Sequence, residues 1–315
     1  MEHAVHRFSL SSAHDGLKLS CFSIVPESPR AVVQMTHGMN EHKDRYLPLA
    51  QYLANKGFCV VMHDHRGHGK SVRTKSDLGF FYDDGAAGIV ADLAQVNRYC
   101  KETFPDLPVF LFAHSMGTLA ARVYLKEHDS DIDGVILCGA PVKNPMVIPG
   151  IVLLRTMSMI LGQRHRSHLA TALVLGGFRK KFPNEEKSAW ICTDQEVVQA
   201  YMADPLCNYE FTLNGYLNLL HLMRGSFSLK GWQMGNPELP IRFIAGEDDP
   251  CIENETKFAQ SVQFLQNRGY STVTSRLFPA MRHEIHNEKE HAQVFHDIEK
   301  TLSGWLRLAQ KRKKY

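Results

Sequence analysis

Several features that mark secreted, metal-binding and membrane-spanning proteins are missing from this sequence. Its seven cysteines are widely scattered, and no two form a C-x-x-C pair, which argues against a disulfide framework or a cysteine-rich zinc motif. The first ten residues contain no apolar core of a secretory signal. The longest apolar stretch, residues 148–161, is broken by Pro149 and Arg155 and is too short to cross a bilayer. We therefore expect a reduced, cytoplasmic protein.

The charge is too small to indicate a nucleic-acid partner. The 36 lysines and arginines are nearly balanced by 33 aspartates and glutamates, which gives a net charge of +3 over 315 residues. Only residues 311–314 form a basic run, and a run of that length is typical of a solvated tail. Hydrophobic residues at 44% and charged residues at 22% are ordinary for a globular protein with a sizeable core. The composition does not indicate whether the protein is a monomer or an oligomer.

Apolar runs and helical spacing alternate along most of the chain. Strand-like runs occupy residues 5–10, 17–25, 31–36, 58–62, 109–112, 134–138, 241–245 and 272–278. The first two flank Asp15-Gly16, a typical hairpin turn. Helices are expected at residues 46–56, 92–104, 116–126 and 289–308, with a further one ending at 268. This order predicts the α/β class, with a mostly parallel central sheet flanked by helices.

The alternation fails between Pro141 and the strand at 241–245. Residues 142–232 contain Met- and Leu-rich helical segments and no clear buried strand. We predict a core made of residues 1–141 and 233–315, interrupted by a helical lid at 142–232. Its apolar residues, among them Leu154 and Met157, would line an acyl tunnel or dock on a membrane surface. The alternative is that they only pack the lid onto the core.

Ser115 lies at the centre of Ala113-His-Ser-Met-Gly117, between a predicted strand and a predicted helix. A strand-to-helix turn this sharp strains the backbone of its central residue and requires small residues two positions before and after it. Ala113 and Gly117 meet that requirement. The pattern is common by chance, but its position favours a catalytic serine over an ordinary helix-capping serine.

Candidates for the other two members of a catalytic triad follow the last two predicted strands. Glu247, Asp248 and Asp249 come shortly after one of these strands, and chemistry alone leaves the choice of acid open. His283 stands at the matching position after the other. The order serine, acid, histidine is that of the α/β-hydrolase fold and differs from the orders in chymotrypsin and subtilisin.

The backbone N–H groups of Met39 and Met116 are candidates for an oxyanion hole. In α/β-hydrolases one donor comes from the residue after the nucleophile and the other from a loop after an earlier strand, here residues 36–40. Gly38 permits a close approach of that loop.

The His63–Ser71 segment imitates three other motifs, each of which fails at one position. A Walker A loop would need a glycine at Asp64, and a dinucleotide turn lacks its third glycine. A His-x-His-x-Asp-His metal site would need an aspartate at Gly67. We interpret the segment as a structural turn in which Arg66 and His68 make buried hydrogen bonds.

Five segments, taken together, carry a family resemblance. They are residues 36–46, residues 63–71, the serine elbow, Gly246-x-x-Asp249-Pro250 and residues 282–288. In this order they resemble the monoglyceride lipase/lysophospholipase family of α/β-hydrolases, most closely its bacterial members, over about residues 5–140 and 238–308. The resemblance implies that the acid is Asp249 and that the early oxyanion donor is Met39. Alanine replaces the commoner glycine at position 113.

The resemblance implies a serine carboxylic-ester hydrolase acting on a lipid ester, either monoacylglycerol or lysophospholipid. Ser115 would form an acyl-enzyme with the help of His283 and Asp249, and no metal or organic cofactor is needed. The enzyme would be cytoplasmic, with peripheral membrane contact through the lid as a further expectation. An esterase or thioesterase for small water-soluble acyl substrates is the alternative, and a catalytically inactive binding protein with the same fold is the third hypothesis.

Overall fold

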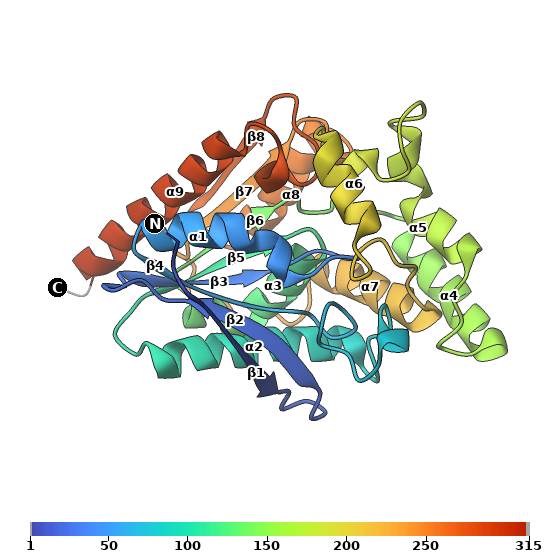
Figure 1. The fold of residues 1–315 in the computed structure, drawn as a ribbon, viewed down its shortest axis with the longest axis horizontal. Helices are drawn as coiled ribbons and strands as arrows, with labels where there is room; N and C mark the ends of the chain where they lie inside the picture. Colours follow the sequence, from blue (N-terminus) through green and yellow to red (C-terminus); the bar gives the residue numbers. More distant parts are fainter. Residues whose placement is uncertain (1, 313–315) are drawn as a thin grey trace.

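The computed structural model describes residues 2–312, and within that range an eight-stranded sheet forms the centre of the molecule (Figure 1). The strands in chain order are β1 (Val5–Ser11), β2 (Lys18–Ile24), β3 (Ala31–Thr36), β4 (Phe58–His63), β5 (Val109–His114), β6 (Gly134–Cys138), β7 (Ile241–Gly246) and β8 (Val273–Phe278). Their order across the sheet is β1-β2-β4-β3-β5-β6-β7-β8. The β1–β2 and β2–β4 pairs are antiparallel, and every other pair is parallel.

The central strands are apolar because both of their faces are covered. Every residue of β3, β4, β5 and β6 is buried. Successive side chains of β5 enter opposite halves of the core: Phe110 and Phe112 pack on one side, Leu111 and Ala113 on the other. The buried cysteines Cys59 and Cys138 are small core residues of this kind, as their apolar surroundings in the sequence predict.

Helices cover both faces of the sheet, as the alternating pattern predicts. Helices α1 (Leu47–Asn55) and α9 (His291–Arg312) pack against each other on one face. Helices α2 (Gly85–Thr103), α3 (Met116–His128) and α8 (Glu255–Gln266) cover the other. In Figure 1, α1 and α9 lie on the upper left, and α2 lies along the bottom of the view. The parallel strands end at one edge, where the loops that carry the candidate residues meet.

The segment between β6 and β7 contributes helices and no strand to the described sheet. These are α4 (Val147–Leu161), α5 (His168–Lys180), the short η4 (Ala189–Ile191), α6 (Gln195–Ala203) and α7 (Leu213–Ser226). Helix α7 packs against α2 and α3 and also supports α4, so it joins the insertion to the core. In Figure 1, α4, α5 and α6 lie beyond the end of the sheet. Among the described residues, no helix is long and apolar enough to cross a membrane.

Candidate active site

Ser115 occupies a strained turn between β5, which ends at His114, and α3, which begins at Met116. Its backbone angles are φ 52° and ψ −118°, a conformation that few non-glycine residues adopt. The turn is tight on its other side too, since a Cβ atom at Gly117 would lie 2.7 Å from the carbonyl oxygen of His37. The small residue required there by the sequence pattern is therefore explained by close packing.

His283 and Asp249 face each other after the last two strands. The imidazole Nδ1 of His283 lies 2.9 Å and 3.0 Å from the two carboxylate oxygens of Asp249. Both side chains are buried, whereas Glu247 and Asp248 are exposed. Of the three adjacent carboxylates that the sequence offers, Asp249 is thus the one that contacts the histidine. The backbone N–H of Cys251 donates to Asp249 at 2.8 Å and helps to fix its orientation.

The surroundings of His283 favour its protonated form. Burial by itself disfavours a charged imidazole, but the adjacent Asp249 carboxylate outweighs burial and raises the pKa of His283 well above its usual value. The nearby thiol of Cys251, whose pKa burial raises to about 11, is neutral at physiological pH and adds no charge. An imidazole held this way by a carboxylate is well suited to carry a proton during a reaction.

A glycine that the sequence pattern does not single out makes room for this pair. Gly139 follows β6 with φ +59°. A Cβ atom there would lie 3.1 Å from Cε1 of His283 and 3.3 Å from Oδ2 of Asp249. A side chain at position 139 would have to displace His283 or Asp249 slightly and adopt a left-handed backbone conformation, so glycine suits this position best. A small residue after a buried strand is the only sequence signal that could have identified it.

The loop after β3 lies directly against the serine. A Cβ atom at Gly38 would lie 2.9 Å from the Cβ of Ser115, so the loop can approach this closely only with glycine there. The backbone N–H of Gly38 donates to Glu41 at 2.6 Å, which holds the loop in place. Met116 is the first residue of α3, and its N–H has no acceptor within the helix.

Glu41 is the centre of a buried polar network behind the serine. Its Oε1 accepts hydrogen bonds from Tyr46 at 2.8 Å and His114 at 3.1 Å, and its Oε2 from Arg45 at 3.0 Å. Burial disfavours the carboxylate, but His114 and Arg45 hold the pKa of Glu41 well below its usual value. Arg45 also makes a bidentate pair with Glu284, both bonds being 2.6 Å, which ties the early loop to the residue after His283.

A cavity of about 310 Å³ lies beside the serine. Ser115, Met39 and Met116 line one part of it, so the structure brings these three candidate residues to one place. Most of its remaining wall is apolar and comes from α4, α5 and α7. Leu154 of α4 is part of this wall, whereas Met157 is not and packs instead against the core cluster.

Trp190 brings the insertion into contact with His283. Its ring lies 5.1 Å from the imidazole, and Phe178 of α5 packs behind it at 5.0 Å. Trp190 also lines the cavity. Periodicity could not have identified this residue, because it lies in a short turn at η4.

The His63–Ser71 segment is a buried structural turn, as its interrupted motifs indicate. Arg66 is fully buried and pairs with Asp92, with Nε 2.8 Å from Oδ2. Nδ1 of His68 lies 3.0 Å from the carbonyl oxygen of Arg66. Neither Arg66 nor His68 lines the cavity.

Comparison with known proteins identifies the family. The profile of a hydrolase family described as "serine aminopeptidase, S33" (Hydrolase_4) matches residues 27–290, which include every candidate residue of the site. The chain belongs to this family.

Relatives of similar sequence are named as lipases and phospholipases. A monoacylglycerol lipase of Mycolicibacterium smegmatis is 28% identical over 285 residues, which cover 88% of each chain. A phospholipase of Bacillus subtilis is 24% identical over 85% of this chain and 93% of its own. Among solved structures, a thermostable carboxyl esterase from Bacillus coagulans in complex with glycerol superposes with a TM-score of 0.89 at 26% identity, covering 96% of this chain and 99% of that one.

Together, the family match, these relatives and this structural neighbour confirm the predicted α/β-hydrolase fold and the resemblance to monoglyceride lipases. They also confirm that the protein is a carboxylic ester hydrolase.

Proposed function

We propose that the protein hydrolyses the ester bond of monoacyl lipids with Ser115, His283 and Asp249 as its catalytic triad. One observation carries this proposal: Ser115, Met39 and Met116 line the same cavity, and most of its other lining residues are apolar. A nucleophile, two backbone donors and a lining suited to an acyl chain thus lie in one place. The 2.9 Å contact between His283 and Asp249 supplies the proton acceptor.

In the proposed reaction the hydroxyl of Ser115 attacks the ester carbonyl while His283 accepts its proton. Asp249 holds the imidazole in the required tautomer and stabilises the imidazolium as it forms. The backbone N–H groups of Met39 and Met116 stabilise the negative charge that develops on the carbonyl oxygen. His283 then protonates the departing alcohol, and a water molecule activated by the same histidine hydrolyses the acyl-enzyme.

The apolar walls favour a long acyl chain over a small ester. Leu153 and Leu154 of α4 and Leu219 of α7 line the cavity. Each methylene buried against such a wall contributes about 0.8 kcal/mol, which corresponds to a roughly fourfold change in affinity. The named activities of two relatives, on monoacylglycerol and on phospholipid, support a substrate that carries such a chain.

We propose further that residues 142–232 act as a lid that contacts the membrane surface. Helix α4 turns Val147, Ile151 and Leu154 inward. Its outward side leaves Met159 and Ile160 each 75% exposed. Exposed apolar side chains on a helix that also lines an apolar cavity suit a helix that rests on lipid.

A panel of esters with acyl chains of increasing length tests the proposal. Each chain would be presented on glycerol and on glycerophosphocholine, so that acyl and head-group preferences are measured separately. The proposal predicts that kcat/KM rises severalfold per methylene until the cavity is filled. A preference for acetyl or butyryl esters, with no turnover of longer chains, would instead establish an esterase for small water-soluble substrates.

A further inference from the structure

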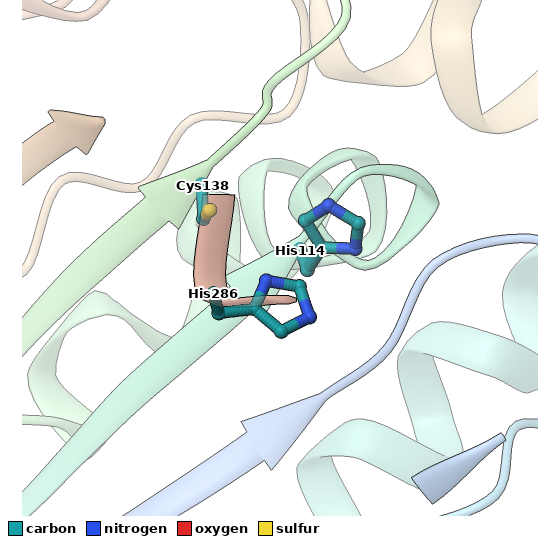
Figure 2. A group of neighbouring side chains, drawn as sticks. All are labelled: His114, Cys138 and His286. Carbon is teal, nitrogen blue, oxygen red and sulfur yellow. The ribbon is translucent and has the colours of Figure 1, made fainter. Parts of the chain in front are cut away.

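Three side chains that the proposed reaction does not use converge behind the catalytic serine. His114 and Cys138 are the last residues of the adjacent strands β5 and β6 and lie directly opposite each other in the sheet. His286 belongs to the short η6 helix (Ile285–Asn287), which follows β8. Figure 2 shows the two imidazoles side by side next to Cys138. One nitrogen or sulfur atom from each residue lies within 4.8 Å of the other two.

His286 has hydrogen-bonding capacity that the protein does not satisfy. The side chain is 2% exposed, and neither Nδ1 nor Nε2 has a hydrogen-bond partner among the described residues. Its ring stacks on Tyr46 at 4.6 Å and meets His114 edge to face at 4.9 Å. A buried polar atom without a partner costs about 1–3 kcal/mol, so two of them on one ring call for an explanation.

His114 is held in the way that metal-binding histidines usually are. Its Nδ1 lies 3.1 Å from the carboxylate of Glu41 and 2.8 Å from the hydroxyl of Tyr46. A carboxylate bonded to one ring nitrogen orients the other nitrogen and increases its basicity. That other nitrogen, Nε2, has only a 3.3 Å contact with the carbonyl oxygen of His283.

We propose that His114, Cys138 and His286 form a binding site for a zinc ion. Two imidazoles and a thiolate are the donor set that zinc and similar borderline-soft dications prefer, with water as a fourth ligand. Zinc holds sulfur at about 2.3 Å and nitrogen at about 2.0–2.1 Å, so in a tetrahedral site the three donor atoms lie roughly 3.3–3.6 Å apart. Binding must therefore draw together atoms that are now separated by up to 4.8 Å. The thiol of Cys138 loses its proton to solvent as the zinc–sulfur bond forms.

Zinc at this site inhibits the enzyme without occupying the cavity. None of the three ligands lines the cavity, so the ion does not compete with substrate for space. By taking Nε2 of His114, it removes the contact between that ring and the carbonyl oxygen of His283. His114 also directly precedes Ser115 in the strained turn. The ion therefore lowers kcat and leaves KM nearly unchanged.

Two other groups of described residues have donor atoms equally close and must be distinguished from this site. Asp249, Cys251 and His283 form one of them, and zinc bound there would block the proposed triad itself. His42, Asp204 and Cys207 form the other, in which His42 is already paired with Asp204 at 2.8 Å. Each group contains one cysteine, so serine substitutions at Cys138, Cys207 and Cys251 form a matched set.

Cobalt(II) spectroscopy on the chelator-treated full chain tests the site without reference to activity. Cobalt is used as a spectroscopic substitute for zinc, because a cobalt–thiolate bond gives a charge-transfer absorption band. We expect one equivalent of cobalt to produce this band and zinc to abolish it. The band should be lost in Cys138→Ser and retained in Cys207→Ser and Cys251→Ser. His286→Phe, which keeps a ring stacked on Tyr46, should weaken zinc binding at least about tenfold by calorimetry.

Two results would overturn the proposal. One is a band that survives Cys138→Ser and disappears in Cys251→Ser, which would place the ion on the proposed triad. The other is no metal uptake by folded wild-type protein, which would mean that the nitrogens of His286 are satisfied by water. The outcome does not depend on the substrate, so the metal site and the proposed function can fail separately.

Discussion

Burial separates Asp249 from the two acidic residues before it. All three follow β7, but Asp249 alone among them is enclosed and lies 2.9 Å from His283. The sequence predicts a triad acid in this loop because of its position after a strand, and only the family resemblance singles out Asp249 among the three. Local sequence does not report which of three neighbouring carboxylates turns inward, because that depends on contacts with Gly139 and His283, which are distant in the chain.

Asparagine substitutions at Asp249 and Asp248 test the acid. Asp249→Asn should lower kcat by a factor on the order of 10⁴, because His283 loses the partner that fixes its tautomer. Asp248→Asn, the matched control on an exposed neighbour, should leave kcat within a fewfold of wild type. Steady-state kinetics on a soluble ester measures both, and the opposite ranking would refute the assignment.

The pH profile of the same variant gives an independent readout. His283 must be neutral to accept the proton of Ser115, so kcat/KM should rise with pH through the raised pKa of this histidine. Without the carboxylate the pKa falls, and the residual activity of Asp249→Asn should reach its plateau at a lower pH than that of wild type. An unchanged profile would show that Asp249 does not set this pKa.

At the scale of elements, runs that are buried on both faces are the easiest to predict. All eight strands lie within two residues of their predicted ends. The four central strands, β3 to β6, are mostly apolar and buried throughout, and runs of this kind have few alternatives in a protein of this composition. Helix α2 begins at Gly85, earlier than its apolar spacing reveals, since Gly85-Ala-Ala-Gly88 has little hydrophobic pattern. In the insertion, the sequence indicates helices but not which of their faces border a cavity. That depends on how α4 rests on α7.

Two adjacent residues of α4 allow the cavity and the outer surface of the proposed lid to be tested separately. Leu153 lines the cavity, whereas Val152 does not and is 62% exposed. Leu153→Asp should flatten the rise of kcat/KM with acyl length while keeping acetyl ester turnover, because it places a charge in the acyl path. Val152→Asp should keep the chain-length dependence and weaken binding to phosphatidylcholine vesicles.

The two substitutions serve as controls for each other, since both place the same side chain on the same helix. A chain-length assay with soluble esters and a vesicle flotation assay measure the two effects separately. If Leu153→Asp left the chain-length dependence intact, the cavity would not be the acyl site. If Val152→Asp left vesicle binding unchanged, this side of α4 would not contact lipid.

For the molecule as a whole, buried histidines set a limit on stability in acid. Burial disfavours their charged forms and lowers the pKa of both His63 and His68 to about 3. In the unfolded chain they return to the ordinary value of about 6.5. Between these values the unfolded state binds more protons than the folded state. The stability contributed by the neutral histidines is therefore present above about pH 6.5 and is lost progressively as the pH falls toward 3.

Removing one of these histidines should reduce the pH dependence of stability. Between pH 5 and 6, His63→Asn should decrease the slope of the unfolding free energy by about 1 kcal/mol per pH unit. Val61→Ala, a control in the same strand, should lower stability equally at each pH, because valine does not titrate. Urea unfolding at several pH values measures both slopes. If the unfolding free energy of wild type and of His63→Asn changed equally with pH, the result would contradict this account.

The most direct test of the whole account is to identify the residue that a fluorophosphonate probe labels. Such probes react with a serine that is activated as a nucleophile, which is the role proposed for Ser115. Mass spectrometry of the labelled wild-type protein should find one modified residue, Ser115, with loss of ester hydrolysis in proportion to labelling. Folded Ser115→Ala should neither be labelled nor hydrolyse esters. Labelling of another residue, or hydrolysis that persists in Ser115→Ala, would contradict the central claim.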